Sequence, residues 1–137
     1  MDTELGDLIR VGDGAMVIVT AAYRGERGGC LAGFHTQCSI DPPRVAVWVS
    51  KANHTLRVAL QASHLGVHYL EPRDIELARR FGELSGDDVD KFAGCAVEEG
   101  PDGVPLLADC RNRLVGPRVS FSDDGCDHVC FVVEAEA

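Results

Sequence analysis

The sequence predicts a mainly β fold, a small β-barrel with peripheral helices. Segments rich in β-branched residues lie near both ends of the chain, at 15–23 and 128–134, and such segments favour strands. Glycines and prolines, rather than helices, separate the first strands, which favours antiparallel hairpins. A barrel is favoured over a doubly wound parallel sheet, because residues 1–50 and 98–137 lack the strict alternation of strands and helices that such a sheet requires.

The N-terminal part of the chain carries the first three strands. After the strand at 15–23, the glycine-containing segment 24–29 predicts a turn and 30–35 a returning strand. Residues 41–43, Asp-Pro-Pro, form a stiff connector, because proline cannot donate a ladder hydrogen bond. The connector leads into 44–49, whose apolar sequence predicts a central strand that is buried on both faces.

Helical periodicity begins in the middle of the chain. Apolar residues recur at helical spacing over 53–63, with Asn53 or Thr55 as the N-cap. A short strand is expected at 65–70. An amphipathic helix then opens at Pro72, and its expected inward face consists of Leu77, Ala78, Phe81 and Leu84.

The C-terminal third of the chain is again β-like. Turns at 100–103 and 122–125 delimit one or two strands within 106–122 and a last strand at 128–134, for a total of about six. No internal repeat, low-complexity tract or linker interrupts the sequence. We therefore expect residues 1–137 to form one domain.

Composition and charge restrict the partners. The chain has 137 residues, of which 45% are hydrophobic, and its 22 acidic and 13 basic residues give a net charge of −9. Nucleic acid is not expected as a partner, because no Lys/Arg cluster exists to bind phosphates. The apolar stretches are too short to span a membrane, and the acidic residues at 1–4 are unlike a signal peptide. We expect a soluble cytoplasmic protein with a polar lead-in at 1–13.

The six cysteines allow more than one interpretation. Their even number is compatible with a disulfide framework, but without a signal segment we expect reduced thiols that fill small apolar spaces. Cys126, His128 and Cys130 would share one face of a strand and could begin a metal site. No fourth ligand is adjacent and no Cys-x-x-Cys pair occurs, so we expect no metal. The other cysteines are Cys30, Cys38, Cys95 and Cys110.

Three segments carry residues suited to a planar, anionic ligand. In 29–43, the small residues Ala32 and Gly33 would let a ring approach the backbone, whose amides could bind heteroatoms or phosphate oxygens. At 50–55, a lysine and small polar side chains open a helix, an arrangement suited to an anion. Near the C-terminus, Asp127-His128 could act as an acid/base pair or a polar anchor.

Each of these segments also has a structural interpretation. Residues 29–43 could be only a barrel corner, and 50–55 only a helix cap beside a solvated lysine. His128 could be a structural histidine. We interpret His64 and His68 as structural. A serine hydrolase and a Rossmann fold are not supported, because neither Gly-x-Ser-x-Gly nor Gly-x-Gly-x-x-Gly occurs.

Taken in order, the three segments resemble the flavin reductase-like family, which has the FMN-binding split-barrel fold. The family motif is approximately Gly-x-Thr-Ala-Asn-Ser-Phe-x-Ser-Val-Ser-Leu-Asp-Pro-Pro, and its C-terminal Gly-Asp-His corresponds to 125–128, with Cys126 inserted. Residues 103–107 also resemble a Gly-x-Pro-Leu-Leu element of the family, and the resemblance extends from about Gly14 to Val133. The direct matches to the motif are Gly29, Ala32, Ser39, Asp41, Pro42 and Pro43, and the departures are Leu31, Gly33, Phe34, His35 and Cys38.

The resemblance implies a homodimer with FMN or FAD near the interface and NAD(P)H as the reductant. Hydride would pass from the nicotinamide to flavin N5, so no side-chain acid or base is obligatory. His128 would lie near the ring where NAD(P)H stacks. The isoalloxazine ring or ribityl chain would contact Leu31, Ala32, Gly33, Phe34 and His35. The ribityl chain and phosphate would contact Cys38, Ser39, Ser50, Lys51, Asn53, His54 and Thr55.

The leading function is therefore a flavin reductase, with supply of reduced flavin to a monooxygenase as one use. The loss of the motif's Asn-Ser pair at Gly33-Phe34 leaves room for a second interpretation, in which a deazaflavin serves another reduction. A third interpretation is a flavin- or deazaflavin-binding protein without its own NAD(P)H turnover, acting in storage or electron transfer.

Overall fold

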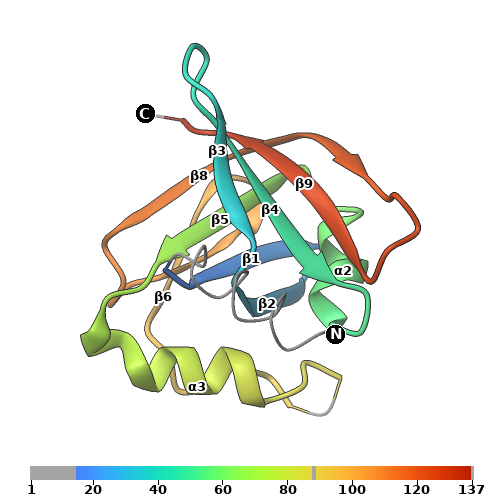
Figure 1. The fold of residues 1–137 in the computed structure, drawn as a ribbon. Helices are drawn as coiled ribbons and strands as arrows, with labels where there is room; N and C mark the ends of the chain where they lie inside the picture. The colour runs from blue at the N-terminus through green and yellow to red at the C-terminus, as the bar shows by residue number, and fades with distance from the viewer. Residues whose placement is uncertain (1–14, 88, 137) are drawn as a thin grey trace, which may run out of the picture.

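The computed structural model describes residues 15–87 and 89–136, which form a curled, antiparallel β-sheet (Figure 1). Within these residues the main sheet has seven strands in the order β2-β1-β5-β8-β9-β4-β3. The barrel-like, antiparallel architecture expected from the sequence is confirmed, while the lead-in at 1–13 lies outside the described residues. The strands are β1 (Val17–Tyr23), β2 (Glu26–Ala32), β3 (His35–Ser39), β4 (Arg44–Ser50), β5 (His64–Tyr69), β8 (Arg113–Ser122) and β9 (His128–Glu134).

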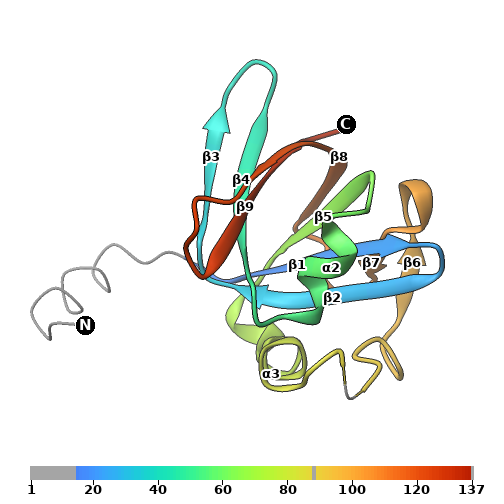
Figure 2. The same ribbon diagram turned by 90° about the vertical axis from the view of Figure 1, so that its right-hand side faces the viewer.

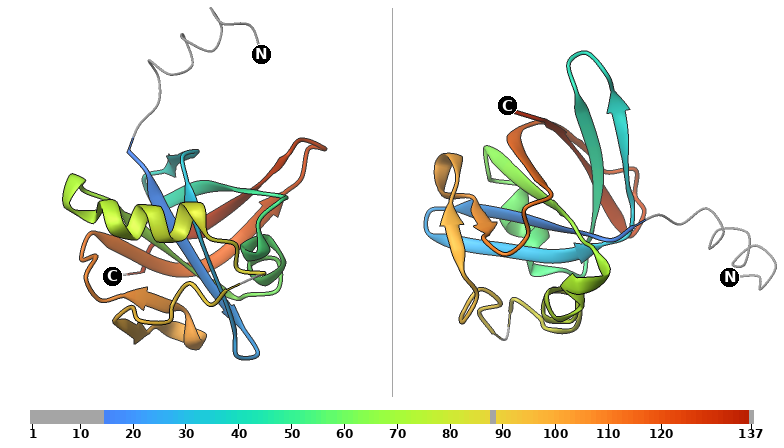
Figure 3. Two further views of the ribbon diagram at one scale, coloured as in Figure 1. Left: turned by 90° about the horizontal axis from the view of Figure 1, so that it is seen from below. Right: turned by 90° about the vertical axis from the view of Figure 1, so that its left-hand side faces the viewer.

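Smaller elements cover both faces of this sheet at β1 and β2, with α2 (His54–Ala59) on one face and α3 (Ile75–Glu83) on the other. Helix α3 lies across the strands (Figure 3), and the shorter α2 packs against β1 and β2. A separate ribbon pairs β6 (Val97–Glu99) with β7 (Pro105–Leu107), and the 3₁₀ turns are η1 (Pro72–Asp74) and η2 (Pro101–Gly103). The chain therefore has more, shorter strands than predicted. None of the described helices is long and apolar enough to cross a membrane.

The first hairpin turns more tightly than the sequence predicts. The expected turn at 24–29 is reduced to Arg24 and Gly25, whose φ angles of 49° and 81° suit a two-residue hairpin loop. Gly29 instead lies inside β2, where a Cβ atom would be 2.7 Å from the Phe81 ring. Glycine is required there by close packing of α3 on the strand, rather than by a turn.

Valines on alternate positions build the core. Along β4, Val45, Val47 and Val49 are buried, whereas Trp48 and Ser50 are half-buried on the opposite face. The prediction that this strand is buried on both faces holds at Ala46 but not at Trp48, and β4 is paired on both sides, with β9 and with the edge strand β3. An antiparallel sheet buries one face against the core, so buried and more exposed side chains alternate along its strands.

Helix α3 is amphipathic, as predicted, with one exception. Phe81 is buried and packs edge-on against Phe92, with ring centroids 5.2 Å apart, while Leu77 and Ala78 are half-buried. Leu84 is 41% exposed rather than inward-facing. The helix ends at the preceding residue, and the extended backbone at Leu84 takes its side chain off the apolar face.

Candidate functional site

Strands β4 and β9 bring several of the predicted site residues together at one end of the sheet. Ser50, the last residue of β4, pairs with His128, the first residue of β9. The Lys51 amide then donates to the Asp127 carbonyl at 2.8 Å. Phe34 approaches from the segment between β2 and β3. We call Phe34, Ser50, Lys51 and His128 the β4–β9 cluster.

An aromatic pair forms one half of this cluster. The rings of Phe34 and His128 have centroids 5.0 Å apart and are tilted by 58°. The Trp48 amide donates to the Phe34 carbonyl at 3.0 Å, which fixes the backbone beneath the Phe34 ring. Phe34 nevertheless remains 52% exposed. The cluster therefore presents aromatic surface on which a planar ring could stack.

The predicted Asp127–His128 pair is formed. Nδ1 of His128 lies 2.7 Å from an Asp127 carboxylate oxygen. This hydrogen bond, together with the histidine's charge, holds the pKa of the Asp127 carboxyl below its usual range. The contact fixes the orientation of the imidazole and leaves its other nitrogen free of this carboxylate.

Lys51 forms the cationic half of the cluster. Its Nζ donates to Oδ1 of Asp123 at 2.8 Å, in the turn that joins β8 to β9. The hydrogen bond from Lys51 holds the pKa of the Asp123 carboxyl below its usual range. Sequence reasoning missed Asp123, because the two residues are far apart in the chain and only the pairing of β9 with β4 brings the turn to Lys51.

The residues that follow Lys51 have structural partners of their own. Asn53 caps α2, as predicted, with its Oδ1 accepting the Thr55 amide at 3.0 Å. Thr55 is 1% exposed, because α2 packs closely on Gly28 of β2. These side chains therefore support the helix instead of joining the β4–β9 cluster, and α2 itself has only six residues.

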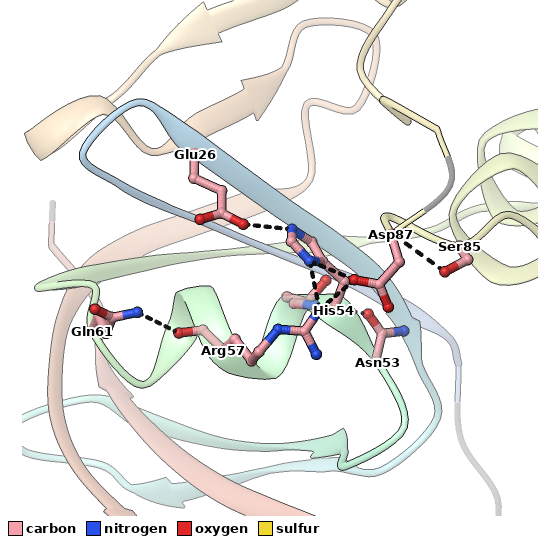
Figure 4. A network of polar contacts seen from close by, with 8 residues as sticks. Glu26, Asn53, His54, Arg57, Gln61, Ser85 and Asp87 are labelled. Carbon is pink, nitrogen blue, oxygen red and sulfur yellow. Dashed lines mark hydrogen bonds and ion pairs between the residues drawn. The ribbon is translucent and has the colours of Figure 1, made fainter.

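His54 lies in a separate polar network (Figure 4). Its Nε2 is 3.2 Å from Glu26 of β2, and its Nδ1 is 3.2 Å from Asp87 in the loop after α3. Arg57, one turn further along α2, also contacts Asp87. The network joins α2 to β2 and to this loop, and both ring nitrogens of His54 are engaged in it.

Replacing Asn53 with alanine should lower the free energy of unfolding by about 1 kcal/mol, because the Thr55 amide loses its acceptor. Urea unfolding followed by circular dichroism measures this change. Asn53→Ser is the matched control, since a serine oxygen can still cap the helix. An equally unstable serine variant would show that Asn53 stabilises the protein by some other contact.

The residues from Leu31 to His35 divide between core and surface. Ala32 is buried, and Leu31 packs against the buried apolar cluster that includes Ile18 and Phe81. Gly33 is half-buried beside Met16. The His35 ring lies edge-on to Tyr69, with centroids 5.8 Å apart, and its Nε2 contacts the Ala15 carbonyl.

Cys38 and Ser39 lie far from Lys51 within one chain. Ser39 pairs with Arg44 at one end of β4, whereas Ser50 is at the other end. The six residue steps from Arg44 to Ser50 span about 20 Å along the strand. The structure therefore does not bring these two residues into the β4–β9 cluster of the same chain, although the sequence predicted that they act with Lys51.

The cysteines are free thiols with different environments. Cys30 and Cys110 are buried, as expected for apolar fillers, and burial raises the pKa of the Cys30 thiol to about 11. Cys38 and Cys126 are instead exposed. Among residues 15–87 and 89–136, no group of three or more His, Cys, Asp or Glu side chains is placed to hold a metal ion.

The donor set of the β4–β9 cluster fits a phosphorylated flavin. The Lys51 ammonium and the Ser50 hydroxyl can donate to phosphate oxygens. The Phe34–His128 pair offers the aromatic surface that an isoalloxazine or nicotinamide ring requires. A cation and an aromatic platform therefore lie side by side at one end of the sheet.

Curated relatives support this interpretation. The chain is 30% identical over 121 residues to a ferric-chelate reductase (NAD(P)H) of Archaeoglobus fulgidus, covering 88% of this chain and 72% of the relative. It is also 30% identical over 134 residues to a high molecular weight rubredoxin of Moorella thermoacetica. That match covers 96% of this chain but 57% of the relative, so the chain spans little more than half of the Moorella protein.

Solved structures share the fold over nearly the whole chain. A flavin reductase domain protein from an Arthrobacter species superposes with a TM-score of 0.86 at 26% identity, covering 100% of this chain and 83% of that one. The NADH:FAD oxidoreductase of Streptomyces globisporus gives 0.83 at 25% identity, with coverages of 100% and 83%. An FMN-binding protein from Thermus thermophilus gives 0.82 at 25% identity, with coverages of 91% and 69%.

The family model described as a flavin reductase like domain matches residues 10–137, which is almost the entire chain. The motif residues, the split-barrel sheet and the relatives all agree with this match. The chain therefore belongs to the flavin reductase-like family and is a flavin oxidoreductase with the split-barrel fold.

Proposed function

We propose that the protein catalyses NAD(P)H-dependent reduction of FMN at the β4–β9 cluster. The observation that carries this proposal is the position of Lys51 and Ser50 beside the half-exposed Phe34–His128 pair. A bound flavin would supply the hydride acceptor, its N5 atom. The protein contributes binding and orientation: Lys51 holds the phosphate, and the aromatic pair aligns the rings.

His128 is the residue to which we assign contact with the nicotinamide. Its ring is partly exposed and is oriented by Asp127 on one side and Phe34 on the other. In this role it orients the nicotinamide against the flavin and transfers no proton. Gly33 and Phe34 offer backbone amides to the flavin ring, in place of the Asn-Ser side chains of the family motif.

FMN is the flavin that the cluster suits best, because a terminal phosphate carries more charge for Lys51 than the bridging phosphates of FAD. FAD is the alternative, and the two related proteins named for their flavin differ on this point. The Thermus protein is described as FMN-binding, and the Streptomyces protein as an NADH:FAD oxidoreductase. Direct comparison of the two dissociation constants decides between them.

We propose further that the working unit is a homodimer. The hairpin of β3 and β4 extends beyond the rest of the barrel (Figure 2), and Ile40 near its tip is 85% exposed. A second copy would cover this hairpin. Cys38 and Ser39 of one chain would then lie near the flavin site of the other chain. Sedimentation velocity at micromolar concentration tests the assembly, and a monomer that binds FMN fully would contradict it.

The electrons can leave the flavin by several routes. Identity to the Archaeoglobus ferric-chelate reductase favours a ferric chelate as a second substrate. Sequence similarity to the Moorella rubredoxin favours a protein as the electron acceptor. A monooxygenase that uses free reduced flavin is an alternative acceptor. Reduction of a ferric chelate is tested with ferric EDTA, with and without FMN, by measuring the ferrous iron that forms.

The test of the proposed function is a flavin-dependent turnover assay. The purified protein is mixed with NADH or NADPH and FMN without oxygen, and the loss of absorbance at the flavin band is followed. Catalysed bleaching is the expected result. Binding of FMN without bleaching would support a storage or electron-transfer protein, and bleaching of a deazaflavin alone would identify that cofactor. The absence of both binding and turnover would remove the proposal.

A further inference from the structure

We propose that Asp123 is an internal competitor of the flavin phosphate, occupying Lys51 in the free protein and lowering its affinity for phosphorylated flavins. This inference rests on the proposed function, because it takes Lys51 as the phosphate-binding cation. It adds a residue, in the β8–β9 turn, that determines how well the site distinguishes FMN from riboflavin. The contact between the two side chains is the starting observation.

The Asp123 carboxylate is well placed to imitate a phosphate. Its Oδ1 accepts from the Lys51 Nζ at 2.8 Å and from the Gly125 amide at the same distance. An oxygen that receives a charged donor and a backbone amide has the environment of a bound phosphate oxygen. Gly125, with a φ of +84°, allows the tight turn that directs its amide at the carboxylate.

The backbone of Lys51 is hydrogen-bonded next to the β8–β9 turn, so its side chain stays close to the acidic residues of that turn. The Lys51 amide donates to the Asp127 carbonyl at 2.8 Å, which holds the β4 end against the start of β9. Three carboxylates, on Asp123, Asp124 and Asp127, lie within five residues of sequence here. A phosphate that approaches Lys51 must therefore replace one carboxylate and enter the field of two others.

The ion pair is open to exchange. The side chains of Lys51 and Asp123 are 36% and 46% exposed, and ion pairs of this exposure are weak and screened by salt. A phosphate dianion offers more charge and more acceptor oxygens than a carboxylate, so it can displace Asp123. Riboflavin has no phosphate and does not require the exchange. Asp123 therefore lowers the affinity for FMN selectively.

Asp123→Asn tests this competition. The amide oxygen of asparagine can still accept the Gly125 amide, while the charge that holds Lys51 is removed. We expect the dissociation constant for FMN to fall about 3- to 5-fold, and that for riboflavin to change by less than about 2-fold. Quenching of flavin fluorescence gives both constants, and circular dichroism confirms that the variant is folded.

Asp124→Asn is the matched control, because it removes the same charge from the adjacent residue without breaking the Lys51–Asp123 pair. Its FMN constant should stay within about 2-fold of the wild type. If both variants bind FMN more tightly by the same factor, the effect comes from the general negative charge of the turn and the proposed competition is wrong. Weaker FMN binding by Asp123→Asn would also overturn the inference, since Asp123 would then position Lys51 for the phosphate.

Failure of the inference can be separated from failure of the proposed phosphate site. If Lys51→Met weakens FMN and riboflavin equally, Lys51 does not bind the phosphate, and the site assignment fails. If Lys51→Met weakens FMN alone while Asp123→Asn has no effect, the phosphate assignment stands and the competition is wrong. The double variant, Lys51→Met with Asp123→Asn, should bind FMN no better than Lys51→Met.

Discussion

Replacing Lys51 with methionine should weaken FMN binding by about 10- to 100-fold and leave riboflavin binding within about 2-fold. The ammonium is the cation of the β4–β9 cluster, and a hydrogen bond to a charged group contributes more than a neutral one. Methionine keeps most of the apolar part of the side chain and removes the ammonium, with its charge and its hydrogen-bond donors. Lys51→Glu should have a larger effect on FMN, because it adds a repulsive carboxylate.

Fluorescence titrations with FMN and riboflavin measure this selectivity. Arg57→Met is the matched control, because Arg57 is an exposed cation on α2 that contacts Asp87 rather than the cluster. The control should leave both constants within about 2-fold of the wild type. An equal loss of FMN and riboflavin affinity in Lys51→Met would mean that Lys51 supports the structure of the site and not the phosphate.

Strands whose side chains alternate or whose residues are β-branched could be predicted from the sequence. The strands β1, β4 and β9 have this composition and were found. Strand β2 was partly missed, because Gly28 and Gly29 have low strand preference and indicate a turn locally. They are glycines because α2 and the Phe81 ring pack against them, a contact between distant segments that no local pattern reveals.

The candidate site could be predicted only in part, for a related reason. Ser50, Lys51 and His128 were identified, and their meeting follows from the pairing of β4 with β9. The partners Asp123 and Glu26 were not identified, because exposed acidic residues are common in a chain with a net charge of −9. Their roles depend on strand register, which brings one to Lys51 and the other to His54.

The structural interpretation of His68 leads to the largest expected effect on stability. This residue is fully buried in β5, where its Nδ1 donates to the Ile18 carbonyl at 3.1 Å and its Nε2 accepts the Leu107 amide at 3.0 Å. The imidazole therefore joins β5 to β1 and β7 in its neutral form. Protonation would place an N–H on Nε2 against the Leu107 N–H. Burial is the main cause that lowers the pKa of His68 to about 4.

The protein should consequently lose stability as the pH falls from 6.5 toward 4. In this range the unfolded chain binds a proton at His68, whose ordinary pKa is 6.5, while the folded chain does not. Above pH 6.5 both states are neutral and this residue contributes no pH dependence. Each unit by which the pKa of His68 differs between the unfolded and the folded chain changes the free energy of unfolding by about 1.4 kcal/mol. We therefore expect the free energy of unfolding to fall by roughly 2 to 3 kcal/mol between pH 7.5 and 4.5.

Urea unfolding of the wild type and of His68→Gln at a series of pH values isolates this contribution. Glutamine can also donate to one carbonyl and accept one amide, but it does not titrate. The variant should be less stable at pH 7.5, because its shorter reach strains the two hydrogen bonds, and the difference from the wild type should narrow as the pH falls to 4.5. The other histidines and the carboxylates are common to both proteins and cancel. A difference that stays constant over this range would show that His68 is not held neutral in the folded protein.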